Sequence, residues 1–424
     1  MINDMGKVYN LKITTFSPVH IGDIIPFEPT GYVIYNPDEQ GKAGQNNKVS
    51  DEDVIECLEC GYVNPLNKVM NNPYCLGCDA ELDLPANRTK NEPKVAEKIS
   101  PSYLYTFNPK QLSEALSDLE KKQLLEVARS GNFYKLEEFF KSKTAKIVQQ
   151  ASKYALVCPV IANQYNQKYG NEAAQKGKEN KFDIGRNISN PVSGMAYIPG
   201  SSLKGALRTA LMSESNSKIG LTYKNIEQTK GNKIAYDASK AEKKLYDYGN
   251  PQSDPFKYLK ISDTVPQDMY LSEISVARNY KRYSGKSQMP EFIEVIPHNT
   301  VFLTELVLAK NALSKEVQNL PDTMSDIRTA CNSFYGDILA QEKLYVESQA
   351  LYENLQRAAQ KPNAFLLRVG KHSGAESVTI DGLRRIKNRV SGKYMDHSTT
   401  YWLAENGTEK LPFGWCVVEF EEVR

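Results

Sequence analysis

The chain has 424 residues, 40% hydrophobic and 25% charged, a composition that can bury ordinary cores, predicts two or three domains and excludes global disorder. Its 53 basic and 51 acidic residues leave a net charge of +2, so nucleic-acid binding would need local basic clusters. Neither an apolar run of the roughly 18 residues that cross a bilayer nor the apolar core of a signal peptide is present, so the cytoplasm is the expected location, with no membrane partner.

The N-terminal part combines short strands with polar segments. Residues 8–16 alternate apolar and polar side chains, which predicts a strand, and residues 32–35 predict a second one. Residues 36–50 are polar and contain glycine, as loops do, and residues 84–97 have the composition of a linker. The segment between these two stretches contains four of the seven cysteines.

Helical patterns and insertions follow. From residue 108 to 155, leucines recur at helical spacing after an Asn-Pro start. Residues 163–181 are rich in Asn, Gln, Lys and Gly and predict a loop. A helix with serine caps is expected over residues 201–212, and the charged stretch 231–254 is expected to be an insertion.

Further strands and one long helical region are expected in the C-terminal half. The elements then run strand, helix, strands, twice over, which suits an α+β fold of two ferredoxin-like (RRM-like) βαββαβ domains with insertions. The first domain would comprise residues 1–36 and 101–290, and the second residues 291–424, while residues 37–100 would form an inserted zinc-ribbon module with linkers. The strands are expected over residues 256–261, 270–280, 292–309, 365–369 and 415–420, and the helical region over residues 325–359.

Four cysteines, Cys57, Cys60, Cys75 and Cys78, form a CxxC–x14–CxxC pattern. The short gaps let both sulfurs of a pair face one ion, and four thiolates complete the tetrahedron that Zn2+ prefers. With no position left for water the predicted ion is structural, and it would supply the folding energy of a segment too small for its own core. Four unrelated reduced thiols or an iron–sulfur cluster are the alternatives.

Residues 200–208 combine a glycine, two serines and two cations. Gly200 would let the backbone approach a partner closely, and Ser201, Ser202 and the first helical amides would form an anion site at a helix N-terminus. Lys204 and Arg208 lie four residues apart on one helix face, so both could reach the same run of phosphates. The spacing of a Walker A loop is absent. The alternative is an ordinary capped helix with a solvated basic face.

Residues 198–211, IPGSSLKGALRTAL, closely resemble the signature of the RAMP superfamily, the ferredoxin-like RNA-binding proteins of CRISPR systems. Residues 17–23, 260–263, 366–377 and 411–415 are similar to signatures of one branch, the fifth subunit of type III-A Csm effector complexes. Together the blocks span the chain from residue 16 to 415. The cysteine-rich insertion departs from the family pattern, and its function stays open.

This resemblance implies a non-catalytic RNA-binding subunit of the Csm complex. Such a subunit caps the filament at the 3′ end of the crRNA, packs against the backbone RAMP subunit and other Csm subunits, and aids crRNA maturation with host nucleases in antiviral defence. Structural Zn2+ is the expected cofactor.

Further basic clusters favour contact with RNA, because cations neutralise phosphates and tyrosines stack on bases, although a run of charge is more often a solvated face. The RNA-binding residues expected outside residues 200–208 are His20, then Arg278, Lys281 and Arg282 beside Tyr280 and Tyr283, then Arg368, Lys371 and His372, and finally Arg384 and Arg385.

The alternative function is a RAMP endoribonuclease that processes or cleaves RNA. His20 could act as general base on a ribose 2′-hydroxyl, and Asp23 lies near the place where backbone subunits carry a catalytic aspartate. The pattern of a capping subunit argues against both roles. No catalytic residue is therefore expected, and His20 is expected to hydrogen-bond its own turn or to touch guide phosphate.

Overall fold

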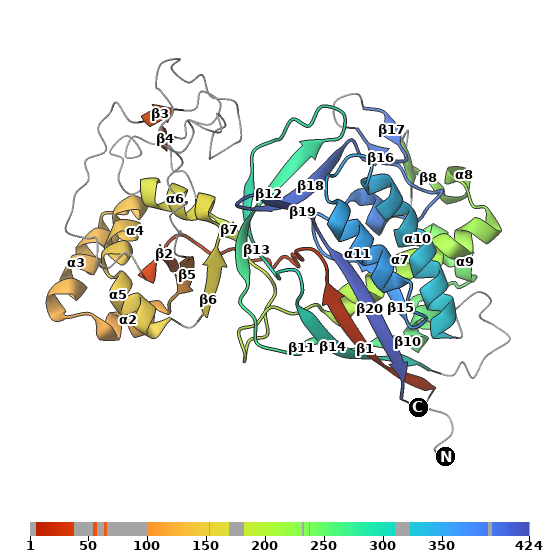
Figure 1. Cartoon of the computed structure of the whole chain (residues 1–424), viewed down its shortest axis with the longest axis horizontal. Helices are drawn as coiled ribbons and strands as arrows, with labels where there is room; N and C mark the ends of the chain where they lie inside the picture. The colour runs from red at the N-terminus through yellow and green to blue at the C-terminus, as the bar shows by residue number, and fades with distance from the viewer. Residues whose placement is uncertain are drawn as a thin grey trace. The chain divides into compact units, whose positions relative to one another are not determined.

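The computed structural model describes residues 6–37, 54–56, 63–65, 101–151, 153–168, 182–230, 233–236, 238–309, 323–388 and 392–423. The chain divides into two compact units, one formed by Met1–Pro26 with Ile184–Arg424 and the other by Phe27–Asp183. Both units mix helices with antiparallel strands (Figure 1), so the α+β class expected from the sequence is confirmed.

The first unit is built on an antiparallel sheet with β1 (Lys7–Thr15) at its centre. Tyr9, Leu11 and Ile13 of β1 are buried and alternate with more exposed residues, as the period-2 pattern predicts. The neighbours of β1 are β14 (Val301–Leu308) and β20 (Trp415–Glu422), and outside them lie β10 (Leu259–Ile261) and β11 (Val265–Pro266), which pair with β14, and β15 (Ala364–Arg368), which pairs with β20.

Helices α7 (Gly200–Ile219) and α10 (Met324–Glu342) pack on this sheet (Figure 1). They contact each other where the hydroxyl of Tyr335 donates to the carbonyl of Ala206 at 3.1 Å. A single core of apolar side chains joins both helices, α11 (Gln349–Ala359) and the sheet.

A second group of strands in this unit has β12 (Glu273–Lys281) at its centre. Its neighbours are β13 (Glu291–Val295), which also pairs with β7 (Ile184–Gly185), and β18 (Thr400–Asn406), which is followed by β19 (Glu409–Pro412). The shorter elements are α8 (Tyr223–Ile226), α9 (Ala238–Tyr246), the β8 (Glu227–Lys230) and β9 (Lys233–Tyr236) hairpin, the β16 (Ile386–Lys387) and β17 (Tyr394–Met395) hairpin, and the 3-10 turns Pro251–Ser253, Pro255–Tyr258 and Ala375–Val378.

The second unit contains a sheet with β5 (Ser102–Thr106) between β2 (Tyr32–Tyr35) and β6 (Lys153–Val157). Asn108 caps the first helix through the amide of Lys110, with proline at the first helical position, as its sequence predicts. The helices are α2 (Pro109–Ala115), α3 (Asp118–Arg129), α4 (Phe133–Ser142), α5 (Thr144–Gln150) and α6 (Pro159–Lys168), and a backbone hairpin pairs β3 (Val54–Glu56) with β4 (Val63–Pro65).

The structure divides the chain differently from the two predicted domains. Strands on both sides of residue 290 share one sheet, and residues 27–183 form a unit of their own. In chain order, β1, α7, β10, β14, α10 and β20 follow the strand–helix–strand–strand–helix–strand order of a single ferredoxin-like unit. Pairing between strands that are distant in sequence leaves no local signal, which is why the predicted boundary is misplaced.

Local differences are smaller. The loop expected over residues 163–181 overlaps the end of α6, and the insertion at 231–254 contains a strand and a helix. The helical region at 325–359 is two helices, and a 3-10 turn replaces the first part of the strand expected at 256–261.

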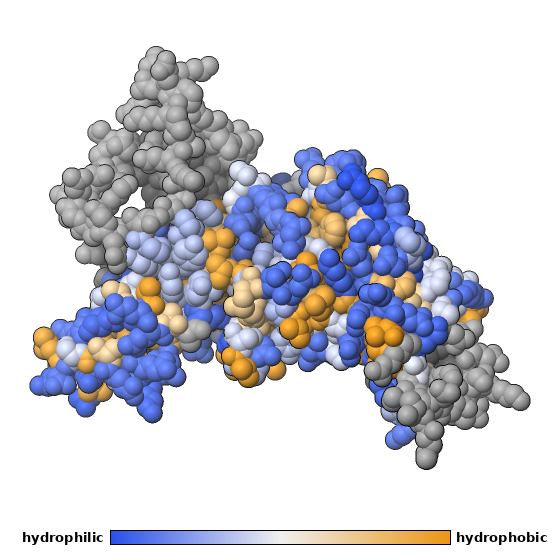
Figure 2. Space-filling view, turned by 60° about the horizontal axis from the view of Figure 1, so that its bottom comes forward, coloured by the Kyte–Doolittle hydropathy of each residue, from blue (hydrophilic) through white to orange (hydrophobic). Residues whose placement is uncertain are grey.

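The face of the molecule shown in Figure 2 is mostly hydrophilic, with apolar residues in separate patches. In the described ranges, no helix has both the length and the apolar character that a membrane crossing needs.

Candidate nucleic-acid interface

Gly200 begins α7 where the helix passes the end of β10. Its amide donates to a carboxylate oxygen of Asp263 at 2.8 Å. A Cβ built on Gly200 would lie 2.4 Å from the carbonyl oxygen of Ile261 and 2.7 Å from that of Ser262. The sequence suggested that Gly200 lets a binding partner approach the backbone closely, but the segment at the end of β10 already lies there. The Asp263 carboxylate already accepts the first amide of the helix.

Arg208 and Lys204, expected to act together, have different surroundings. Arg208 bonds Glu242 at 2.6 Å and Asp254 at 3.0 Å, and its guanidinium lies 4.3 Å from the ring centre of Phe256. Its charge is thus compensated inside the protein. Lys204 is half-buried, and burial, more than the nearby cations Arg208 and Lys260, lowers its pKa.

A smaller basic surface remains at the start of α7. Ser201, Gly205 and Lys260 are exposed, and no ion pair is recorded for Lys204 or Lys260 in the described part of the chain. We call Ser201, Ser202, Lys204 and Lys260 the amino-end surface. Two cations next to the positive end of a helix dipole can bind a phosphate.

His20 is an interior residue, 2% exposed. Its Nδ1 lies 2.7 Å from the carbonyl oxygen of Glu294, so Nδ1 carries the proton. Burial lowers the pKa of His20 and keeps the ring neutral. In this position the ring can reach neither a phosphate nor a ribose, and the structure supports neither the RNA contact nor the general-base role considered from the sequence.

The glycine-rich turn around Gly370 locks onto His20. Gly370 has φ +89, and a Cβ there would lie 2.6 Å from the carbonyl oxygen of His20, which accepts the amide of Lys371 at 2.8 Å. His372 is also at positive φ, and its ring centre lies 4.0 Å from that of Trp402, with the two rings tilted by 37°. The two segments that resemble family signatures therefore hold each other. Within residues 366–377 only the Lys371 side chain is exposed, 3.1 Å from a Glu291 carboxylate oxygen.

The two buried histidines make stability depend on pH. Burial lowers the pKa of His372 to about 3, helped by Lys371 and His20, while the unfolded chain titrates near 6.5. Between these values the unfolded state binds more protons, so the free energy of unfolding should fall as the pH decreases below 6.5, by at most about 1.4 kcal/mol per pH unit for each histidine. Urea unfolding between about pH 5 and 6.5, above the main carboxylate range, measures this slope.

The matched variant is His372→Asn, because asparagine tolerates the positive φ of this position. It should remove roughly half of the slope, since His20 remains. An unchanged slope in His372→Asn would contradict the assignment of the effect to this ring.

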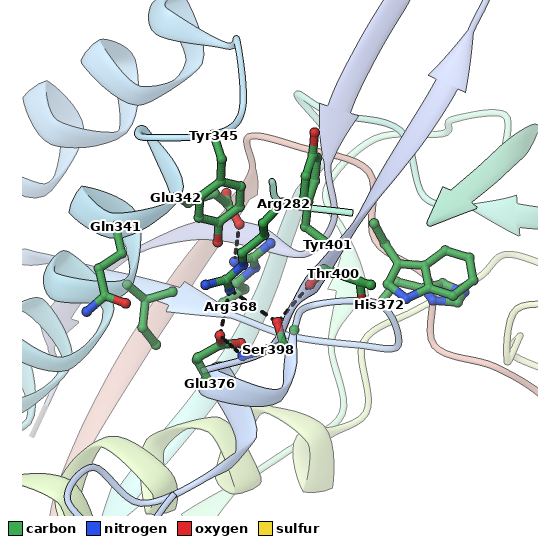
Figure 3. Close-up of a pocket in the computed structure, with 13 residues that line it drawn as sticks. Arg282, Gln341, Glu342, Tyr345, Arg368, His372, Glu376, Ser398, Thr400 and Tyr401 are labelled. Atoms are coloured by element: carbon green, nitrogen blue, oxygen red, sulfur yellow. Dashed lines mark hydrogen bonds and ion pairs between the residues drawn. The ribbon is translucent and has the colours of Figure 1, made fainter. Parts of the chain in front are cut away.

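Three predicted RNA-binding arginines are bound to carboxylates in the interior. Figure 3 shows Arg282 and Arg368 directed into one small pocket, where Arg282 bonds Glu376 at 2.6 Å and Arg368 bonds Glu342 at 2.5 Å. Arg278 bonds Glu405 at 3.0 Å, and the side chains of both are at most 9% exposed. These arginines connect elements of the fold, and their charges are compensated without RNA.

Of the remaining predicted residues, Lys281 is exposed, Arg385 is half-buried and Arg384 is buried. Lys281 lies at the end of β12, Arg384 is bonded to Asp381 at 2.9 Å, and Arg385 lies against the ring of Tyr394. Asp23 is in an exposed loop, where its carboxylate accepts the amide of Ile24. Within the described ranges, no three His, Cys, Asp or Glu side chains gather as metal ligands.

The structure does not bring all the predicted residues together. The 20 residues of α7 span about 30 Å, with the amino-end surface at one end and Tyr223, which contacts Arg385, just beyond the other. The sequence analysis did not predict that Lys260 lies beside Lys204 or that Tyr394 lies beside Arg385. The only signal in the sequence was the alternation of polar and apolar residues around each of them, which indicates an exposed side chain. Cys57, Cys60, Cys75 and Cys78 lie outside the described residues, so the zinc site stays a prediction.

Comparisons with known proteins agree with the resemblance drawn from the sequence. The RAMP superfamily model matches residues 12–370. The "CRISPR system Cms protein Csm5" of Methanocaldococcus jannaschii is 28% identical over 269 residues, which cover 53% of this chain and 63%, less than two thirds, of that protein.

Two solved structures share the fold. A chain of a type III-A Csm–crRNA–target RNA ternary complex, seen by cryo-EM, has a TM-score of 0.54, with 15% identity over 97% of this chain and 100% of that one. The crystal structure of Csm5 from T. onnurineus has a TM-score of 0.52, with 15% identity over 96% and 99% of the two chains. The resemblance to RAMP proteins and to the fifth Csm subunit is confirmed.

Proposed function

This chain belongs to the RAMP superfamily, and from that premise we propose that it is a non-catalytic RNA-binding subunit of a type III-A CRISPR effector complex. In this proposal it caps the filament at the 3′ end of the crRNA, next to the backbone RAMP subunit, and aids crRNA maturation with host nucleases in the cytoplasm. The likeness in sequence to a Csm5 protein, and in fold to a Csm5 crystal structure and to a chain of a Csm–crRNA–target RNA complex, supports the proposal.

The observation that carries RNA binding is the amino-end surface. Lys204 and Lys260 place two cations beside the start of a 20-residue helix, inside the segments that match the family signatures. Each ammonium can neutralise a phosphate and release a counterion, which is how a backbone-binding protein holds RNA without reading its sequence.

Lys204→Ala combined with Lys260→Ala should weaken binding of crRNA. Loss of two phosphate contacts is expected to reduce the slope of log affinity against log salt by about 1.4, since each contact on a single strand contributes about 0.7. Fluorescence anisotropy with labelled crRNA at several salt concentrations measures the slope, and affinity purification of the complex measures guide retention.

Lys361→Ala is the matched control, because Lys361 is an exposed lysine of the same unit whose ammonium is bonded to Glu419 of β20 and is not part of the amino-end surface. It should leave the salt slope unchanged. Equal slopes for the double variant and the wild type, with normal complex assembly, would overturn the assignment of this surface to crRNA.

For contacts with neighbouring protein subunits, the proposal uses an apolar surface on three loops of the first unit. Ile24, Val192 and Met269 are 97%, 94% and 84% exposed on three loops of the first unit. Hydrogen bonds from the Asp23 amide to Arg186 and from the Tyr270 hydroxyl to Ala196 tie the three loops to one another. Exposed apolar side chains on linked loops favour packing against another subunit.

The proposal assigns no catalysis to this chain. His20 is buried and neutral, and Asp23 caps its own loop. We also propose structural Zn2+ bound by Cys57, Cys60, Cys75 and Cys78, from their spacing. Native mass spectrometry should find one zinc ion per chain, and a metal-free chain would refute this part alone.

A further inference from the structure

Two hairpins of the first unit expose aromatic rings beside cations. In the first, residues 281–286 form a tight turn, in which the amide of Lys281 donates to Lys286 at 3.0 Å and Gly285 takes the positive φ that the turn needs. Tyr283 at its tip is 81% exposed. The second hairpin is β16 with β17, where Tyr394 is 52% exposed.

The two hairpins meet. The hydroxyl of Tyr283 lies 3.4 Å from Nε2 of His397, two residues after β17, and Nδ1 of His397 lies 2.6 Å from Asp396. The amide of Arg282 donates to the carbonyl of Thr399 at 3.0 Å. We call the surface formed by both the hairpin surface, with Lys281, Tyr283, Lys286, Arg385, Lys387 and Tyr394.

A stack of planar groups reaches this surface from the interior. The guanidinium of Arg385 lies 5.2 Å from the ring centre of Tyr223 and 4.3 Å from that of Tyr394. Arg385 covers one face of the Tyr394 ring, and the ring's exposure leaves another planar group room to continue the stack. Lys387 is the cross-strand partner of Tyr394, so both side chains lie on the same face of the hairpin.

We propose that the hairpin surface binds single-stranded RNA, with unpaired bases stacked on Tyr394 and Tyr283 and phosphates held by Lys281, Lys286 and Lys387. In the described part of the chain no ion pair is recorded for these three lysines, and all three are exposed. The inference rests on the proposed function in taking RNA as the ligand. It adds that this RNA is single-stranded, and that a second surface binds it about 30 Å, the length of α7, from the amino-end surface.

The chemistry favours RNA over an acidic peptide and a single strand over a duplex. An acidic peptide needs cations but has no use for two exposed ring faces, whereas each nucleotide brings one phosphate and one planar base. In a duplex the bases are already stacked on each other, so the rings could meet only the backbone.

The test measures binding of a short fluorescent single-stranded RNA of mixed sequence to the full chain by anisotropy. Tyr394→Ala and Tyr283→Ala should each weaken binding about tenfold, because base–aromatic stacking contributes this much per base. Tyr394→Phe and Tyr283→Phe, which keep the ring and lose only the hydroxyl, should remain within about twofold of wild type. Lys281→Ala, Lys286→Ala and Lys387→Ala together should reduce the salt slope by about 2.

Both tyrosines are exposed, so thermal unfolding of the variants should match the wild type and exclude misfolding as the cause. Alanine variants that bind single-stranded RNA as tightly as the phenylalanine variants would overturn the inference. So would a duplex RNA that binds the wild-type chain as tightly as the single strand and whose binding the alanine variants weaken to the same extent. If a glutamate-rich peptide competed with RNA for the chain, and the tyrosine variants bound RNA as tightly as the wild type, the surface would be assigned to a protein partner instead.

The Lys204→Ala, Lys260→Ala variant separates the two proposals. If it weakens RNA binding and the hairpin variants do not, the hairpin inference fails and the proposed function stands. If the wild-type chain binds no RNA, both fail.

Discussion

Replacing Glu342 with leucine is expected to lower the free energy of unfolding of the first unit by about 3–5 kcal/mol, because it leaves a buried guanidinium without its counter-charge. Glu342 bonds Arg368 at 2.5 Å, and both side chains are at most 5% exposed. The same carboxylate accepts the indole N–H of Trp415 at 2.8 Å and the hydroxyl of Tyr352 at 3.2 Å. One substitution thus deprives three buried donors of their acceptor.

Urea unfolding followed by far-UV circular dichroism measures the loss. Glu342→Gln should be intermediate, because an amide oxygen still accepts hydrogen bonds but carries no charge. The double variant Glu342→Leu, Arg368→Met should recover only part of the loss, since the pair is removed while Trp415 and Tyr352 stay without an acceptor.

Glu419→Ala is the control for this series. It removes an ion pair with Lys361, whose side chain is 56% exposed, and should change stability by no more than about 1 kcal/mol. If Glu342→Leu were as mild as Glu419→Ala, the buried network could not be the connection between α10, β15 and β20 that the structure shows.

Gly200→Ala is the second large effect expected. The added methyl group would lie 2.4 Å from one backbone oxygen and 2.7 Å from another, and backbone cannot rotate away as a side chain can. The start of α7 must then move off β10, and the expected cost is about 2–3 kcal/mol of unfolding free energy. Thermal unfolding measures it as a lower midpoint.

Gly205→Ala, in the same helix, is expected to have the opposite sign. Gly205 is exposed with open space around it, so alanine should stabilise the helix by up to about 1 kcal/mol. Equal and small effects at both positions would show that β10 does not constrain the start of α7.

How much of this could be predicted differs between local and distant features. The alternation of β1 and the Asn-Pro start of α2 are local patterns, and both are seen in the structure. The sequence also locates the basic residues, but it does not show which carboxylate each one meets. Arg282 finds Glu376 94 residues away, so it is indistinguishable in sequence from Lys281, which stays exposed.

The same limit applies to glycine. Gly200 stands in a segment whose composition suggests an opening for a phosphate, and only the path of β10 shows that the opening is already filled. The domain boundary predicted at residue 290 differs from the structure for the same reason. It separates β1 from its two partner strands, which begin at residues 301 and 415.

The position of β1 has a consequence for biosynthesis. One of its two neighbours, β20, begins at Trp415, about 400 residues after β1, so the sheet at the heart of the first unit stays incomplete until that part of the chain has been translated. The second unit is continuous in sequence and can fold while synthesis is still under way. Until β20 has been synthesised, the buried side of β1, with Tyr9, Leu11 and Ile13, lacks part of its native sheet, and an apolar strand edge in that state is open to aggregation.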